Sequence, residues 1–343
     1  MANRMMIRRE TLALRDLERA DIPLIRRIID TSEYLHLRFA PEELPRLLDL
    51  YPAVGAFSVA TGRTLTSAPA PAPMPPTELL ARRVPAGIAG GFDDSGESGG
   101  VGGSLQAFLL ANSVVPPCAW IGGFGLVWSE GERFAEYLDL LLPLLLRRLA
   151  ARGVSALYYS GSDLEADWLH EPLEARGFML ASLLRSYDKT GYIIPTEGNQ
   201  RVRVRPFMPA DTGQLVALER LCFDDLWRHD APAFLEVAQT YPYFVVAEDP
   251  DRPPESNIVG YQFNVVDAAI GYLVRIAVHP SAEGQGVGAR LMAEAVRYFQ
   301  RHQVAKIVLN TEETNTRAHR LYEWFGFYLT NPRGFALRRE ITR

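Results

Sequence analysis

Val278-His-Pro-Ser-Ala-Glu-Gly-Gln-Gly-Val-Gly-Ala289 leads from an apolar run, through a proline and three glycines, into an amphipathic segment. Glycine tolerates positive φ, so successive backbone N–H groups around Gly284, Gly286 and Gly288 can converge on an anion at the positive end of the following helix. The same composition also occurs in ordinary strand-to-helix connections. The stretch therefore predicts either a plain turn or a cradle for a ligand that carries phosphates.

A second motif decides between these two interpretations. It reads Asn315-Thr-Arg-Ala-His-Arg-Leu-Tyr-Glu-Trp-Phe-Gly-Phe327. Together the two motifs resemble the acyl-CoA signature of the GNAT superfamily of N-acetyltransferases, and the resemblance covers residues 202–343. It implies acetyl-CoA as the co-substrate, no metal, and an α/β fold with a mixed sheet whose fourth and fifth strands part around the pantetheine arm.

Hydrophobic periodicity predicts an order of elements that agrees with this resemblance. Helices are expected at 211–223, 231–239, 287–302 and 316–325. Strands are expected at 202–205, 243–248, 258–266, 270–278 and 305–310, followed by two closing strands. The apolar face of the third helix consists of Val287, Leu291, Met292, Ala295, Val296 and Phe299.

The resemblance also implies which residues bind the co-substrate. The backbone of Ile276, Ala277 and Val278 would pair with the pantetheine amides in place of a neighbouring strand. The pyrophosphate would lie on the loop formed by Gly284, Gln285, Gly286, Val287, Gly288 and Ala289.

Three further side chains near these motifs have candidate roles. Tyr322 would approach the thioester sulfur as a general acid, or it is an aromatic residue packed on an amphipathic helix. Asn315 would contact the co-substrate or cap the helix that follows it. His279 precedes a proline in a turn, so we expect a solvated imidazole rather than a catalytic base.

The acceptor side departs from known patterns. Leu221-Cys-Phe-Asp-Asp-Leu-Trp227 is similar to the acceptor segment of acetyltransferases that act on ribosomal-protein alanine termini, but Asn310 stands where their glutamate base would be. Glu312 and Glu313 are carboxylates that can remove a proton there, or they belong to a solvated turn. Glu283 occupies a position that is usually Arg or Gln, and its charge is expected to weaken CoA binding.

The first half of the chain contains an altered copy of the second half. Leu14-Arg15 with Ala20-Asp21 recurs as Val204-Arg205 with Ala210-Asp211. The copy has no glycine in the stretch 132–139, where the loop would be, and Leu173 corresponds to Tyr322. We therefore predict two tandem GNAT-like domains: a degenerate one at 1–195 that walls the acceptor site, and a catalytic one at 200–343. The Pro- and Gly-rich residues 62–104 are predicted to form a surface insertion.

Composition excludes several other classes of protein. The 343 residues carry a net charge of −5 and a pI near 5.8, which argues against nucleic acid or an anionic membrane as the main partner.

Two distant cysteines, Cys118 and Cys222, predict neither a disulfide framework nor a zinc site. The charged first ten residues do not resemble a signal peptide, and the leucine-rich 138–146 is too short to cross a bilayer, so it is predicted to be a buried helix. A cytoplasmic location is expected. The oligomeric state stays open, since a tandem chain can function as a monomer.

Three functional hypotheses follow. The leading one is an acetyl-CoA-dependent N-acetyltransferase in which a primary amine of a small molecule or amino acid attacks the thioester directly. An enzymatic alternative is acetylation of a peptide or protein N-terminus, or of an amino sugar as in the tandem mycothiol synthases. The non-enzymatic alternative is an acyl-CoA-binding sensor, against which Tyr322 argues because pure binding needs no phenol at the sulfur.

Overall fold

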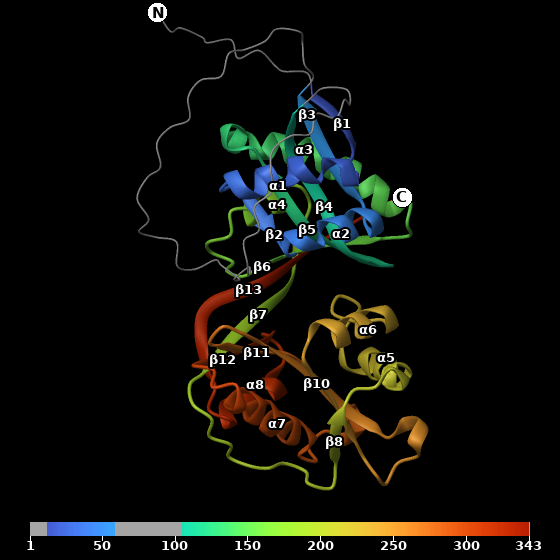
Figure 1. The fold of residues 1–343 in the computed structure, drawn as a ribbon, viewed down its shortest axis with the longest axis vertical. Coiled ribbons are helices and arrows are strands. Elements are labelled where there is room, and N and C mark those ends of the chain that lie inside the picture. Colours follow the sequence, from blue (N-terminus) through green and yellow to red (C-terminus); the bar gives the residue numbers. More distant parts are fainter. Residues whose placement is uncertain (1–11, 59–103, 343) are drawn as a thin grey trace, which may run out of the picture.

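The computed structural model describes residues 12–58 and 104–342, and nearly all of the expected insertion at 62–104 lies outside these residues. The two halves repeat one order of elements (Figure 1). The first half contains β1 (Leu12–Asp16), α1 (Ile22–Thr31), β2 (Leu35–Leu37), α2 (Leu44–Leu50), β3 (Ala53–Ser58), β4 (Leu105–Val115), β5 (Cys118–Leu126), α3 (Phe134–Ala150), β6 (Ala156–Gly161), α4 (His170–Glu174) and β7 (Met179–Lys189).

The second half confirms the predicted helices and strands to within two residues, except at its end. It contains β8 (Arg203–Pro206), α5 (Thr212–Cys222), α6 (Ala231–Thr240), β9 (Tyr243–Glu248), β10 (Ile258–Asp267), β11 (Ile270–Val278), α7 (Val287–Arg301), β12 (Lys306–Glu312), α8 (Thr316–Trp324) and β13 (Tyr328–Glu340). The α/β fold class with a mixed sheet is therefore confirmed.

The prediction of two closing strands after residue 325 is wrong. The chain forms one long strand, β13, with a register irregularity between Leu329 and Arg333. Pro332 and Gly334 interrupt the pattern as a turn would, but the strand continues because its second part has a different partner. Residues 335–340 pair with β6 of the first half.

The two halves exchange strands. Residues 184–189 of β7 pair antiparallel with 307–312 of β12, and β13 pairs with β7 along much of its length. The sheet consequently runs without interruption through the described residues in the order β1-β3-β4-β5-β6-β13-β7-β12-β11-β10-β9-β8. Figure 1 shows β7 and β13 crossing between the halves. The predicted domain boundary at residues 195–200 stays a prediction. Strands from each half pair with strands of the other, since β7 pairs with β12 and β13 pairs with β6.

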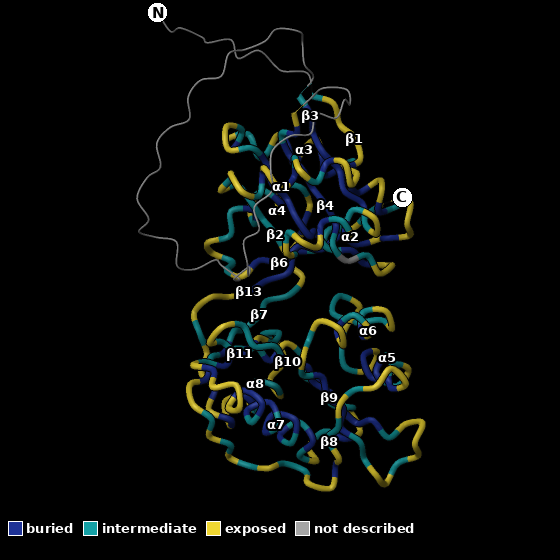
Figure 2. Tube along the Cα trace, in the orientation of Figure 1, coloured by how far each residue is buried: buried dark blue, intermediate teal, exposed yellow. Residues whose placement is uncertain are grey.

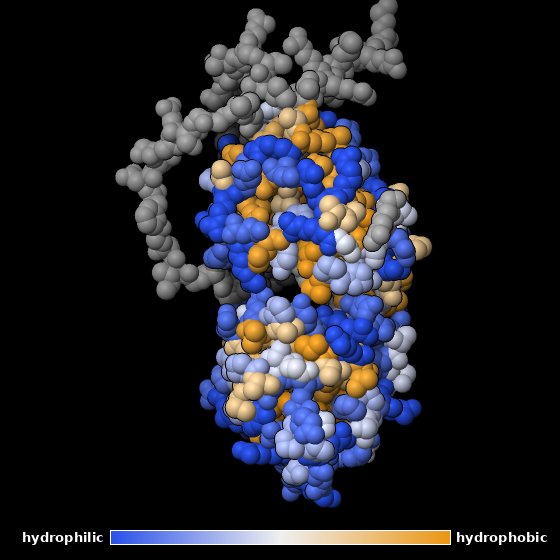
Figure 3. Space-filling model, turned by 90° about the vertical axis from the view of Figure 1, so that its right-hand side faces the viewer, coloured by the Kyte–Doolittle hydropathy of each residue, from blue (hydrophilic) through white to orange (hydrophobic). Residues whose placement is uncertain are grey.

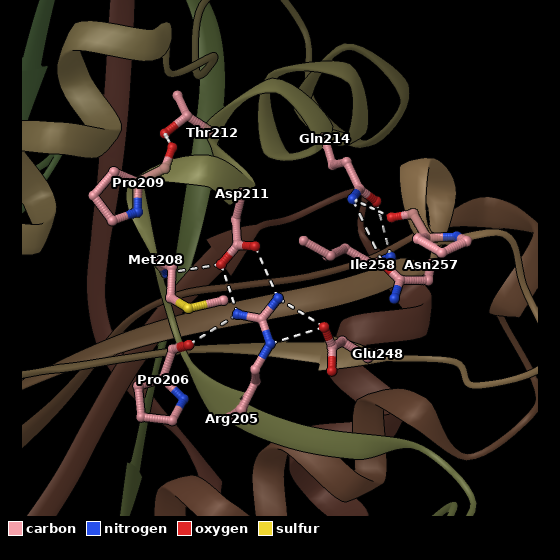
Figure 4. A network of polar contacts seen from close by, with 11 residues as sticks. Arg205, Pro206, Met208, Pro209, Asp211, Thr212, Gln214, Glu248, Asn257 and Ile258 are labelled. Carbon is pink, nitrogen blue, oxygen red and sulfur yellow. Dashed lines mark hydrogen bonds and ion pairs between the residues drawn. The ribbon is translucent and has the colours of Figure 1, made fainter.

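A repeated ion pair marks the start of each half. Arg205 binds both carboxylate oxygens of Asp211 at 2.7 and 2.8 Å, and Asp211 also accepts a bond from the Met208 amide (Figure 4). Arg15 and Asp21 form the same fork at 2.7 and 2.6 Å, with the Glu18 amide as the third partner. The sequence repeat is thus matched by a repeated contact that joins the first strand to the helix that follows.

Helix α7 carries the apolar face that its periodicity predicts. All six predicted face residues are buried, and they pack against β10 and β11 (Figure 2). The leucine-rich stretch 138–146 lies within α3, which buries one face that includes Leu138, Leu141, Leu142, Leu145 and Leu146. Across the described ranges, 12–58 and 104–342, no helix combines the length and apolar character needed to cross a membrane.

Candidate active site

The parallel strands β11 and β12 pair only at their first residues. The pairs are Ile270 with Lys306, Gly271 with Ile307, and Tyr272 with Val308. Beyond Tyr272, β11 continues to Val278 with only β10 as a strand partner among the described residues. The backbone edge of residues 273–278 is therefore open toward β12, where a ligand amide can take the place of a missing strand.

The glycine loop lies where this open edge ends. Gly286 is the N-cap of α7 in the left-handed conformation with φ 78°, and Gly284 also has a positive φ, 72°. The first N–H groups of a helix have no intrahelical acceptor, so those of α7 are available to an anion. Gln285, Gly286, Ala289 and Trp324 line an open hollow of about 530 Å³ together with residues 196 and 198–201.

Gly288 does not adopt the positive φ that glycine allows, and its contact with the co-substrate stays a prediction. It lies inside α7 and is not among the glycines with positive φ. A β-carbon there would lie 3.3 Å from Leu321 of α8 and 3.6 Å from Val278 of β11. Gly288 thus allows α7 to approach both neighbours closely.

One backbone group of the open edge has a partner that the sequence did not reveal. The Cys222 thiol, at the end of α5, donates to the Val278 carbonyl at 3.2 Å. Burial raises the pKa of Cys222 to about 11, so the sulfur remains a protonated donor at neutral pH. A pantetheine amide at Val278 would have to share or displace this bond.

Tyr322 lies on the α8 side of β12. The residue is buried, and its ring contacts Tyr187 and Phe327, so the packed-aromatic interpretation describes the ring correctly. Burial raises the pKa of Tyr322 above its usual value, against a smaller opposite effect of the Thr311 hydroxyl. The phenol therefore stays protonated, which suits a hydrogen-bond donor, while its role as an acid remains a prediction.

Asn315 and His279 occupy simple structural roles. The Asn315 side chain caps α8 by accepting a bond from the Ala318 amide at 3.1 Å, and its contact with the co-substrate stays a prediction. His279 accepts a bond from the Ser281 amide at 3.1 Å in the turn before the loop. Burial, followed by the charge of Arg252, lowers the pKa of His279.

The segment after α5 lies on the opposite face of the opening. The Trp227 indole N–H donates to Oε1 of Glu312 at 2.7 Å, and Arg275 donates to the Trp227 carbonyl at 2.6 Å. Two residues of the first half complete this side. The Trp120 ring contacts the Trp227 ring at a tilt of 35°, with centroids 5.4 Å apart, and the Ser182 hydroxyl donates to Oε1 of Glu312 at 3.2 Å. Ser182 and Trp120 carry no motif, so only the fold reveals them.

A buried polar cluster fixes this segment to the sheet. Glu219 has no exposed surface and accepts bonds from Arg275 at 2.7 Å, from the His229 amide at 2.8 Å and from the Tyr261 hydroxyl. The Arg275 guanidinium lies 3.7 Å above the Phe223 ring. Burial alone would raise the pKa of Glu219, but His229, Arg275 and Tyr261 together lower it, so the carboxylate is ionised.

The two halves also enclose a pocket of about 300 Å³ (Figure 3 shows the side on which the surface is hollowed between them). Val115, Pro116, Pro117, Cys118 and Trp120 line it from the first half. The second half contributes Val216 and Arg220 of α5 and residues 225, 226 and 228–230. First-half residues thus border the segment that carries Trp227.

In the first half, the equivalent opening is filled by the chain itself. The parallel strands β5 and β6 pair only at residues 118–120 and 156–158, just as β11 and β12 pair only at their first residues. Beyond that point, β2 pairs antiparallel with residues 123–125 of β5. The Arg38 amide continues this ladder with a bond to the Gly122 carbonyl at 2.8 Å. The strand β2 was not predicted, since three residues give too short a pattern.

Aromatic side chains close the rest of this opening. Tyr34 contacts Trp128 and Trp168, with ring centroids 5.8 and 5.9 Å apart. A β-carbon on Gly131, just before α3, would lie only 2.0 Å from the Tyr34 ring. The sequence predicted that the first half has lost its co-substrate site. The structure agrees, because β2 occupies the edge of β5 and the Tyr34 ring covers the start of α3.

An open strand edge, a glycine loop at a helix start and a capped helix beside the opening form the arrangement that the two sequence motifs predicted. Residues 213–327 match the family model described as Acetyltransferase (GNAT) family. This part of the chain is therefore a domain of the GNAT superfamily, as the two motifs predicted.

Relatives and solved structures agree with this assignment. The chain is 32% identical over 81 residues to a mycothiol acetyltransferase of Stackebrandtia nassauensis, and 34% identical over 89 residues to one of Acidimicrobium ferrooxidans. These matches cover 22% and 24% of the chain and 26% and 27% of the relatives, so they span about a quarter of each relative.

The structural matches extend over the whole chain. A tandem GNAT protein from the clavulanic acid biosynthesis pathway aligns with a TM-score of 0.59 at 11% identity, covering 97% of this chain and 99% of that one. A GCN5-related N-acetyltransferase from Sphaerobacter thermophilus aligns with a TM-score of 0.56 at 16% identity, covering 97% and 96%. The prediction of two tandem GNAT-like domains is confirmed at the level of fold.

Proposed function

We propose that the protein is an acetyl-CoA-dependent N-acetyltransferase that acetylates a primary amine of a small molecule or amino acid. The observation that carries this proposal is the open edge of β11 at residues 273–278, which ends at the glycine loop. Acetyl-CoA would lie with its pantetheine amides along Ile276 to Val278 and its pyrophosphate at Gly284 to Ala289. It supplies an activated acetyl group, and the residues of this chain orient it and exclude water.

The fit of this co-substrate is supported by the contrast between the halves. Apart from its own chain neighbours, no atom of the described residues lies within 4 Å of a β-carbon built on Gly284, whereas the equivalent region of the first half is covered by Tyr34. The catalytic unit is therefore proposed to be residues 200–343. Residues 1–195 complete the sheet and wall the acceptor side through Trp120 and Ser182.

The acceptor is proposed to be small because both halves crowd the opening. The relatives named mycothiol acetyltransferases favour an amino-sugar thiol as the second candidate acceptor. A peptide N-terminus is less well supported, since Asn310 lies where the base of that subfamily would be. We propose the cytoplasm as the location, where acetyl-CoA is available and Cys118 and Cys222 stay unpaired.

A thiol-release assay tests the function. The purified chain is incubated with acetyl-CoA and a panel of amino acids, amino sugars, polyamines and N-terminal peptides. Turnover with at least one small amine supports the proposal. Tight binding of acetyl-CoA, measured by calorimetry, without turnover of any amine would instead indicate a sensor.

A further inference from the structure

Successive residues of β12 point to opposite sides of the opening. Ile307 and Leu309 are buried in the core cluster that contains Tyr322, and Thr311 contacts the Tyr322 hydroxyl. Because side chains alternate along a strand, Val308, Asn310 and Glu312 face the other side, where Glu312 meets Trp227. A thioester held between β11 and β12 would therefore have the phenol on one side and the Glu312 carboxylate on the other.

The two oxygens of Glu312 are used unequally. Oε1 accepts both hydrogen bonds, from the Trp227 indole and from the Ser182 hydroxyl. Oε2 accepts none from any residue within 12–58 and 104–342. The carboxylate is thus held in place through one oxygen, while the other is left for a ligand.

Other candidate proton acceptors near the opening are occupied or unsuitable. Glu313 is paired with Arg185, and Glu219 is buried and bound to Arg275. Asn310 carries an amide, which is not a base at neutral pH.

We propose that Glu312 is the general base of the acetyl transfer, and that Ser182 of the first half and Trp227 position its carboxylate. This inference rests on the proposed function and deepens it. It also gives the degenerate half a direct part in catalysis, because Ser182 belongs to β7 and acts through Glu312.

The neutral amine nitrogen of the acceptor forms a bond to the thioester carbonyl carbon, and the electron pair of the C=O bond moves to oxygen. The nitrogen then carries a positive charge and passes one proton to Oε2 of Glu312. As the carbonyl re-forms, the C–S bond breaks and the thiolate takes up one proton. Glu312 returns its proton to solvent, so the products are an amide and a thiol.

The decisive variant is Glu312→Gln. Its amide oxygen can accept the same two bonds from Trp227 and Ser182, so the variant removes the basic oxygen while keeping the contacts. We expect kcat to fall by about 10²- to 10⁴-fold, with an unchanged Kd for acetyl-CoA. Glu312→Asp should retain more activity than Glu312→Gln, because it keeps a carboxylate.

The matched control is Glu313→Gln, which removes the neighbouring carboxylate and should stay within about two-fold of wild type, as expected for the loss of a partly exposed ion pair. The positioning residues need a separate readout. In Ser182→Ala the Glu312 carboxylate loses one of the two bonds that hold it, so kcat should fall while the Kd for acetyl-CoA stays unchanged. Ser182→Thr, which keeps a hydroxyl, should retain more activity than Ser182→Ala. In Trp227→Phe kcat should fall in the same way.

The outcomes separate the two proposals. If wild type acetylates an amine and Glu312→Gln does so at the wild-type rate, the base assignment is overturned and the function stands. If wild type acetylates no amine in the panel, the proposed function fails. If Ser182→Ala has the kcat of wild type, or if Ser182→Thr is no more active than Ser182→Ala, the positioning role is rejected.

Discussion

Glu283 and Arg317 form an ion pair that links the glycine loop to the first turn of α8. The carboxylate was expected to weaken CoA binding by standing near the phosphates. The pair changes that expectation, since the charge of Glu283 is balanced by Arg317, whose side chain is 70% exposed and therefore accessible to an anionic ligand. Binding would then require Arg317 to exchange one anionic partner for another.

Glu283→Gln should therefore tighten acetyl-CoA binding. Two unit charges about 4 Å apart in water interact by about 1 kcal/mol, which corresponds to roughly a five-fold change in Kd. Titration calorimetry at low and moderate salt measures it, and the gain should shrink as salt increases. Arg317→Ala should weaken binding, and the exposed Glu171→Gln in the first half should have no effect. Weaker binding in Glu283→Gln would show that the pair organises the loop.

Gly286→Ala should damage both the fold and the site. The residue has φ 78°, which costs an L-residue about 1–2 kcal/mol, and a β-carbon would lie 3.1 Å from the Asn199 amide nitrogen. Thermal denaturation and calorimetry should both show the loss. Gly213→Ala is the matched control, because that residue lies in α5 with nothing within 4 Å of its β-carbon. It should be neutral or slightly stabilising.

Tyr322→Phe should lower kcat by roughly ten-fold or more without changing the Kd for acetyl-CoA. The ring and its contacts with Tyr187 and Phe327 are kept, so only the hydroxyl is tested. Because burial raises the pKa of Tyr322, wild type should lose no activity through its ionisation up to about pH 10. A pH–rate profile measures this, and unchanged turnover in the variant would leave Tyr322 a packing residue.

The chain should bind one molecule of acetyl-CoA. β2 occupies the edge of β5 that corresponds to the open edge of β11, and Tyr34 covers the start of α3. Calorimetry with the full chain gives the stoichiometry directly. Two equivalents bound would mean that β2 leaves the sheet when the ligand enters.

Glu219→Gln should destabilise the protein by about 3 kcal/mol or more, because it leaves the Arg275 guanidinium buried without its counter-charge. The folded pKa of Glu219 is lowered, so its contribution is present above the unfolded pKa of about 4.3 and is lost as pH falls through the folded value. Urea denaturation should therefore show a smaller difference between variant and wild type in acid than at neutral pH. A constant difference would assign the effect to packing.

The sequence predicted those features of the site that depend on a particular backbone conformation or on a helix cap. The glycine loop predicted the start of α7, Asn315 predicted the cap of α8, and the Arg15/Asp21 and Arg205/Asp211 repeat predicted two related halves. These features are local, so a few adjacent residues specify them.

Non-local pairing could not be predicted in the same way. Nothing in residues 179–189 shows that β7 pairs with β12, and nothing in 335–340 indicates β6 as a partner, since alternation specifies a strand but not its neighbour. Ser182, Trp120 and Cys222 reach the site only through that pairing and through helix packing. The sequence offered Glu312 and Glu313 as equivalent candidates. The structure distinguishes them, because Glu312 binds Trp227 and Ser182 while Glu313 is paired with Arg185.

The exchange between β7 and β13 also constrains how the chain can be made. The sheet of the first half lacks residues 335–340 until synthesis has passed residue 340. At roughly 5–20 residues per second, that delay is on the order of ten seconds on the ribosome. During that time β6 presents an unpaired edge, which is a hazard for aggregation, so the nascent first half is the stage at which chaperones would matter most.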